Sequence, residues 1–80
     1  GWEEWREIGE RYGAGLVGLT LQAAMDTGMI ERQPLRPLTH MLLGAIDEAA
    51  MYVARAEDGA TAREEVGAAV DRLLEGLRPR

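Results

Sequence analysis

The stretch that decides the fold is LRPLTHMLLGAIDEAAMYVARA, residues 35–56. At about 100° per residue its apolar side chains gather on one side of a helix, where they form a stripe of Leu35, Leu38, Leu42, Ala45, Ile46, Ala49, Val53 and Ala56. Both edges of the stripe are widened by Leu43, Ala50, Ala54, Met41 and Tyr52. A surface helix of a monomer usually has an apolar stripe little wider than about 100°. We therefore expect this helix to pack against its own domain on one side and a second partner on the other.

Two further helices flank this stretch. Residues 2–27 carry apolar side chains at three- and four-residue steps, a helical period: Trp2, Trp5, Ile8, Tyr12, Leu16, Leu19 and Ala23. Residues 59–77 carry a coiled-coil-like seam of Val66, Val70, Leu73 and Leu77. Because only a short turn separates residues 35–57 from residues 59–77, these two helices must be antiparallel neighbours. The sequence predicts an all-α fold of three antiparallel helices, and no stretch has the alternation of a strand.

Glycine and acidic residues predict where the helices bend, begin and end. Gly28 is expected to end the first helix in the left-handed conformation. The third helix can begin at Asp58 as its N-cap or at the capping box Thr61–Glu64. The glycines of residues 13–18 weaken the middle of the first helix, so we expect a kink or break near residues 13–15.

Size, composition and charge bound the class of protein. A chain of 80 residues makes one domain or part of one, and it buries only about 60% of its unfolded surface, so a second copy or a further segment would stabilise it. The chain begins with Gly1 and shows no signal peptide, and we expect a cytoplasmic fragment or processed product. No apolar run approaches the about 20 residues that span a bilayer. The net charge of −5, without a basic patch, excludes DNA binding by these residues alone.

Motifs that could carry chemistry are weak in this chain. Residues 13–18 spell GxGxxG, but a dinucleotide site needs a strand before the first glycine, so a close helix crossing is the favoured interpretation. His40 is the only histidine, and Asp47 is the sole candidate for a second ligand on its face, so no metal site is predicted. The chain lacks Cys and Ser, and its threonines are dispersed. We expect neither catalysis nor a cofactor.

Three groups of residues point to contacts with other molecules. Asp47 and Glu48 interrupt an apolar helix, and an Arg of the third helix or of a second subunit, such as Arg63 or Arg72, is expected to pair with them. Small residues let a facing helix approach closely: Gly44, Ala45, Ala49, Ala50 and Ala54. We interpret this surface as a two-fold helix-pair interface rather than only an intrachain hairpin. The aromatic side chains of residues 2–12 have two interpretations, a helical core or the wall of a hydrophobic ligand cavity.

Residues 34–78, PLRPLTHMLLGAIDEAAMYVARAEDGATAREEVGAAVDRLLEGLR, resemble the end of TetR-family transcriptional regulators. The shared pattern is a proline-led helix with Leu-Leu-Gly-Ala and an acidic pair, then Ala-Arg-Ala-Glu-Asp, then a helix with Glu-Val-Gly-Ala-Ala-Val-Asp-Arg-Leu-Leu. Residues 2–30, WEEWREIGERYGAGLVGLTLQAAMDTGMI, are similar to the preceding helices of that C-terminal domain.

The resemblance implies a larger protein whose N-terminal helix-turn-helix domain binds DNA and is absent from this chain. It implies that residues 1–80 are the regulatory and dimerisation region, with helices over 2–27, 35–57 and 59–77. It also implies that the last two helices pair with those of a second subunit as a four-helix bundle. Within the domain, the resemblance implies a pocket for a small hydrophobic or aromatic effector. The expected function is therefore that of a transcriptional regulator, a repressor, acting as a homodimer without a membrane partner.

Candidate residues follow from this interpretation. The candidate ligand-binding residues are Trp2, Trp5, Ile8, Tyr12, Met41 and Met51. The candidate dimer-interface residues are Leu42, Ala45, Ala49, Tyr52, Val66, Val70, Leu73 and Leu77. The alternative hypothesis is a free-standing helical module that docks a partner helix, with neither ligand nor DNA. A basic helix-turn-helix upstream in the parent reading frame would favour the regulator.

Overall fold

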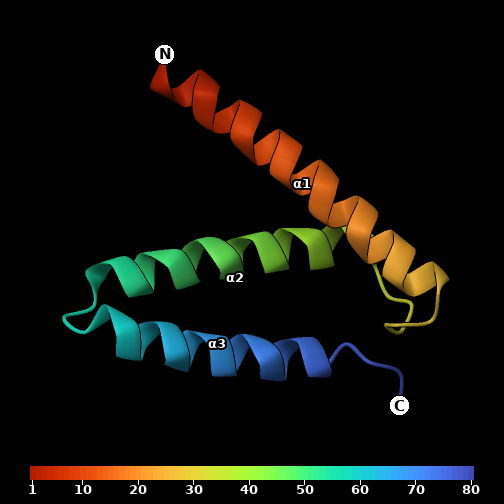
Figure 1. The fold of residues 1–80 in the computed structure, drawn as a ribbon. Coiled ribbons are helices and arrows are strands. Elements are labelled where there is room, and N and C mark those ends of the chain that lie inside the picture. The colour runs from red at the N-terminus through yellow and green to blue at the C-terminus, as the bar shows by residue number, and fades with distance from the viewer.

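In a computed structural model the chain folds into three helices, α1 (Trp2–Asp26), α2 (Leu35–Arg55) and α3 (Gly59–Glu75) (Figure 1). The structure describes the backbone of residues 1–80 and the side chains of residues 1–5, 7 and 11–80. No strand occurs in this described backbone, so the predicted all-α fold is confirmed. Each helix ends one or two residues before its predicted end.

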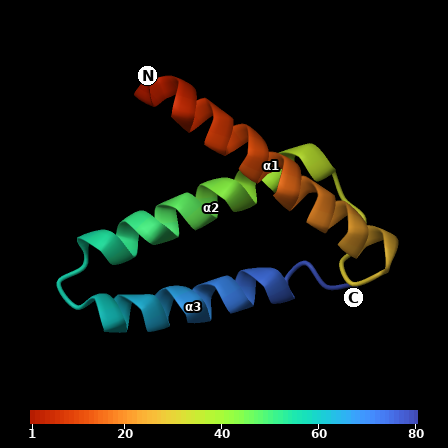
Figure 2. The same ribbon diagram turned by 45° about the horizontal axis from the view of Figure 1, so that its top comes forward.

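The helices α2 and α3 lie side by side and run antiparallel, whereas α1 crosses α2 obliquely (Figures 1 and 2). The hairpin follows from the short turn: Ala56 leaves the helical conformation with ψ of 143°, and α3 begins three residues later. The connection from α1 to α2 is longer and leaves the direction of α1 open. The three helices therefore follow one another in the predicted order, and the oblique crossing leaves α1 in contact with only the first part of α2.

Asp58 is the N-cap of α3, which decides between the two predicted starts of that helix. Its carboxylate accepts hydrogen bonds from the Thr61 amide at 3.1 Å and from the Thr61 hydroxyl at 2.7 Å. These bonds satisfy one of the amides that the first turn of a helix leaves without a partner. The Thr61 hydroxyl and amide bonds lower the pKa of Asp58 below its ordinary value of 3.8.

Replacing the Asp58 cap should weaken α3 and make the thermal midpoint less dependent on pH in the acid range. We expect Asp58→Ala to lower the thermal midpoint, because the Thr61 amide loses its acceptor. The folded-state pKa of Asp58 lies below its unfolded value. The ionised carboxylate therefore contributes fully to the free energy of unfolding above the unfolded pKa, and this contribution is lost as pH falls through the folded pKa. Thermal unfolding followed by circular dichroism between pH 3 and 7 measures both effects. Asp58→Asn, which keeps an acceptor, should retain the cap and lose the pH dependence; an unchanged midpoint for Asp58→Ala would contradict the role of the cap.

The core lies where the second half of α1 crosses the first half of α2. Leu21 and Met25 of α1 and Leu38 of α2 are buried together. Half-buried apolar side chains surround them: Val17, Ile30, Leu35, Leu42 and Leu77. The segment that follows α3 is held there by a hydrogen bond that the Glu31 amide donates to the Leu77 carbonyl at 3.0 Å. The interior is small, and the C-terminus lies near the connection between α1 and α2 (Figure 2).

The helix α1 is continuous through its glycines, so the kink or break expected near residues 13–15 is not present. Its C-terminal end follows the prediction: Gly28 has a φ of +77°, and the Met29 amide donates to the Ala24 carbonyl at 2.9 Å. This left-handed conformation favours glycine. The first half of α1 projects beyond α2 (Figure 1).

Candidate functional site

An open apolar groove of about 400 Å³ runs between α2 and α3. Alanines at 45, 49 and 69 leave the space, because their side chains are too short to fill the gap between two helices. Tyr52 and Leu73 stand at its sides with 56% and 58% of their surfaces exposed. The remaining lining residues are Glu48, Glu65, Val66 and Val70. The groove therefore leaves apolar side chains of both helices open to solvent.

The structure divides the predicted interface residues into two groups. The residues that line the groove are Ala45, Ala49, Tyr52, Val66, Val70 and Leu73. Leu42 and Leu77 instead pack against the core of their own chain. The predicted seam of residues 66–77 therefore changes partner along its length, from the groove at Val66 to the core at Leu77, which lies just beyond α3. Contact of these residues with a second subunit stays a prediction.

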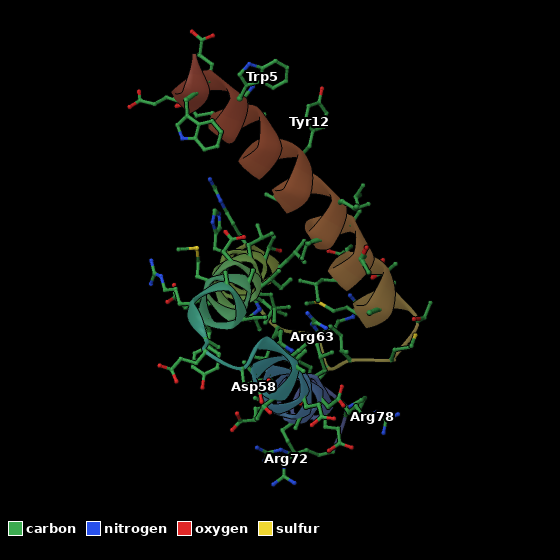
Figure 3. The ribbon with its side chains drawn as sticks, turned by 60° about the vertical axis from the view of Figure 1, so that its left-hand side comes forward. Trp5, Tyr12, Asp58, Arg63, Arg72 and Arg78 are labelled. Carbon is green, nitrogen blue, oxygen red and sulfur yellow. The ribbon has the colours of Figure 1, made fainter. Side chains whose placement is uncertain are left out.

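Two neighbouring acidic side chains of α2, Asp47 and Glu48, lack the expected intrachain partner among the described side chains, and Glu48 lines the groove. Asp47 and Glu48 are both exposed, and among the described side chains no arginine forms an ion pair with either of them; the ion pair that the structure records between side chains joins Arg32 and Asp26 at 3.0 Å. Figure 3 shows Arg63 on the side of α3 that faces α1 and Arg72 on the far side. Pairing with an arginine of α3 is therefore not present among the described side chains, and pairing with an arginine of a second subunit stays a prediction.

A second hollow lies between α1 and α2, and Gly15 and Gly18 of the GxGxxG segment line it. A Cβ on Gly18 would lie 3.7 Å from the Thr39 hydroxyl oxygen, and one on Gly13 would lie 3.9 Å from Leu43. The helices therefore approach closely there, as the sequence indicated. Polar groups at its edge come from Gln22, Arg36 and His40. Among the described residues no group of three or more His, Cys, Asp or Glu side chains could hold a metal ion.

Among the described side chains, the candidate ligand-binding residues do not come together in one chain. Trp2, Trp5 and Tyr12 are exposed on α1, and Trp5 and Tyr12 point away from α2 (Figure 3). Met41 and Met51 are exposed on α2, and neither lines a hollow together with the aromatic residues. The side chain of Ile8 lies outside the described residues. Their role in ligand binding stays a prediction.

The helix α1 has apolar side chains on two opposite faces, which the sequence periodicity did not separate. Val17, Leu21 and Met25 face α2 and the core, whereas Tyr12, Leu16 and Leu19 are exposed. At about 100° per residue, the two sets lie on opposite sides of the helix. In the sequence, the positions of the glycines distinguish the buried face of α1 from its exposed face, because Gly13 and Gly18 lie on the side that meets α2.

These features define an all-α domain with apolar surfaces suited to further helices, a second copy or an apolar ligand. Residues 1–77 match the family described as tetracyclin repressor-like, C-terminal domain, and the chain belongs to this family. The resemblance to TetR-family regulators is thereby confirmed. No curated protein matches the chain. Within the described residues, every helix is too short or too polar to cross a membrane.

Proposed function

We propose that the chain is the regulatory and dimerisation region of a TetR-like transcriptional repressor. The observation that carries this proposal is the open apolar groove between α2 and α3 in a member of the tetracyclin repressor-like C-terminal family. Two such hairpins face each other as a four-helix bundle, which removes Tyr52 and Leu73 from water. Because a little over half of each side chain is exposed in the single chain, its burial contributes roughly half of the 1.5–3 kcal/mol of a fully exposed large apolar side chain.

The exposed face of α1 is the proposed contact for a small hydrophobic or aromatic effector. Trp2, Trp5, Ile8 and Tyr12 are its candidate residues, and aromatic rings supply large apolar contact with few rotatable bonds. Met41 and Met51 contribute only where another helix layer or a second copy completes the pocket. The effector acts by population shift: its differential affinity for two spacings of the DNA-binding domains of the intact repressor sets the change in DNA affinity.

Sedimentation equilibrium of the intact protein tests the dimer. We expect a mass of two chains at micromolar concentration, independent of DNA. A single-chain mass at that concentration contradicts the proposal and favours a helical module that docks another protein.

Tryptophan fluorescence tests the effector site. A hydrophobic compound that releases the intact protein from its operator DNA should quench the fluorescence saturably, because Trp2 and Trp5 lie at the proposed contact. Tyr12→Ala should raise the dissociation constant by about tenfold, which corresponds to the loss of about 1.4 kcal/mol of ring contact. Leu74→Ala, an exposed change on α3, is the matched control and should leave the constant unchanged. Quenching that never saturates for any releasing compound would remove these residues from the site.

A further inference from the structure

The hollow between α1 and α2 is a basic site on an acidic chain. Its volume is about 530 Å³, within the range of about 300–1,000 Å³ that small-molecule pockets occupy. Most of its lining is apolar, and its polar residues are Gln22, Arg36, Thr39 and His40. None of the described lining residues is acidic, although acidic residues outnumber Lys and Arg by 14 to 9 in the whole chain. The permanent charge of Arg36 therefore sets the sign of the hollow.

The interior of the hollow is apolar and open. A Cβ on Gly15 would meet no atom within 4 Å, so the space above this glycine is empty of protein. The Thr39 side chain is buried, and its hydroxyl donates a hydrogen bond to the Leu35 carbonyl at 2.8 Å. Thr39 is thus satisfied within α2 and keeps no donor for a ligand. The side chains that can still donate to a ligand are Gln22, Arg36 and His40, which suits an apolar molecule with one polar end.

The charge at the edge of the hollow favours an anion. Arg36 lies in the first turn of α2, which contains no acid and no side-chain cap, so the positive end of the helix dipole adds to its charge. His40 follows four residues later on the same side of the helix. Arg36 forms no ion pair with another described side chain, whereas Asp26, one turn beyond Gln22, is paired with Arg32 at 3.0 Å. The paired donors of a guanidinium match the two oxygens of a carboxylate.

The apolar lining of the hollow continues onto the exposed face of α1. Leu19 lines the hollow and has 73% of its surface exposed. At about 100° per residue, Leu19 lies about 40° from Gly15 on one side and about 60° from Leu16 on the other. An apolar body that extends out of the hollow therefore passes over Leu19 toward Leu16 and Tyr12, which are exposed as well.

We propose that the hollow between α1 and α2 binds an apolar molecule with a single carboxylate, whose head pairs with Arg36 and whose body lies over Gly15 and Leu19. This inference rests on the proposed effector-binding function and adds the chemical class of the effector and the place of its charged head. One guanidinium balances one carboxylate. A phosphate monoester carries a charge of about −1.5 to −2 at neutral pH, and the chain, with a net charge of −5, repels the surplus.

Isothermal titration of the intact protein with decanoate and decanol, which share their chain and differ in their head, tests the carboxylate contact. Decanoate should bind saturably and at least about fivefold more tightly than decanol. Arg36→Gln should weaken decanoate about fivefold or more and leave decanol within about twofold, because it removes only the charged contact. Arg78→Gln removes the same charge from an exposed residue outside the hollow and is the matched control; both affinities should stay within about twofold.

Filling the hollow tests its location. Gly15→Leu should weaken both decanoate and decanol by about tenfold or more, because the new side chain occupies the space of the apolar body. The fold should tolerate this change, since the site is open and leucine favours a helix more than glycine does. Gly67→Leu, on the exposed surface of α3 and outside the hollow, is the matched control. Circular dichroism verifies that the variants keep their helices.

The outcomes separate this inference from the proposed function. Equal binding of decanoate and decanol, an equal loss of both in Arg36→Gln, or tighter binding of decyl phosphate than of decanoate overturns the carboxylate class. Decanoate binding that survives Gly15→Leu overturns the location. If a neutral compound releases the intact protein from operator DNA while decanoate does not bind, the inference is refuted and the regulatory function stands. If no compound of either kind releases it, the regulatory function itself fails.

Discussion

Leu73→Asp should turn the proposed dimer into a monomer. Leu73 lines the groove with 58% of its surface exposed in the single chain, so the change leaves the fold of the chain intact. In the two-fold dimer it buries two carboxylates without partners, and an unpaired buried charge is strongly destabilising. We expect the dimer dissociation constant to rise by about a hundredfold or more, which sedimentation velocity at several concentrations measures.

The neighbouring residue provides the control for this experiment. Leu74 is also exposed, but it lies about 100° around α3 and outside the groove. Leu74→Asp introduces the same charge at almost the same height and should leave the protein dimeric. Equal dissociation constants for the two variants would show that the groove is not the contact surface.

Leu21→Ala should lower the free energy of unfolding by about 2–3 kcal/mol, since truncation of a buried leucine loses its transfer energy and leaves a cavity. Leu21 is one of three side chains in the buried cluster, with Met25 and Leu38, so few neighbours can close the gap. Urea unfolding of the intact protein followed by circular dichroism measures the loss.

Leu19→Ala is the matched control, because Leu19 lies two residues away on the exposed side of α1. It should change stability by less than about 0.5 kcal/mol. A loss as large as that of Leu21→Ala would mean that the exposed side of α1 is buried in the intact protein.

Local features of the structure could be predicted from the sequence because they depend on neighbouring residues. The helical period, the left-handed Gly28 and the short turn before Asp58 define three helices and the antiparallel pairing of α2 with α3. The same turn places Tyr52 near Val66, and both line the groove.

The orientation of α1 could not be predicted, because it depends on packing between distant residues. Periodicity shows that α1 is apolar, but it does not tell which of two apolar faces meets α2. The sequence pattern emphasised the face of Trp5, Tyr12 and Leu19, whereas the chain buries the face of Leu21 and Met25. The connection at residues 27–34 is long enough to allow several crossing directions. For the same reason, pairing partners for Glu48 could not be assigned within the chain.

The small interior has a consequence for how binding can be observed. No large side chain of the described chain is fully removed from solvent. The free energy of unfolding of the single chain is therefore expected to be small. A molecule that binds only the folded form adds RT ln(1 + [L]/Kd) to the free energy of unfolding, which is about 2.7 kcal/mol at a hundredfold excess over Kd. Against a small baseline, that addition is a large fraction of the total. The melting temperature of this protein is therefore a sensitive indicator of its ligands, and its dependence on protein concentration reports self-association in the same experiment.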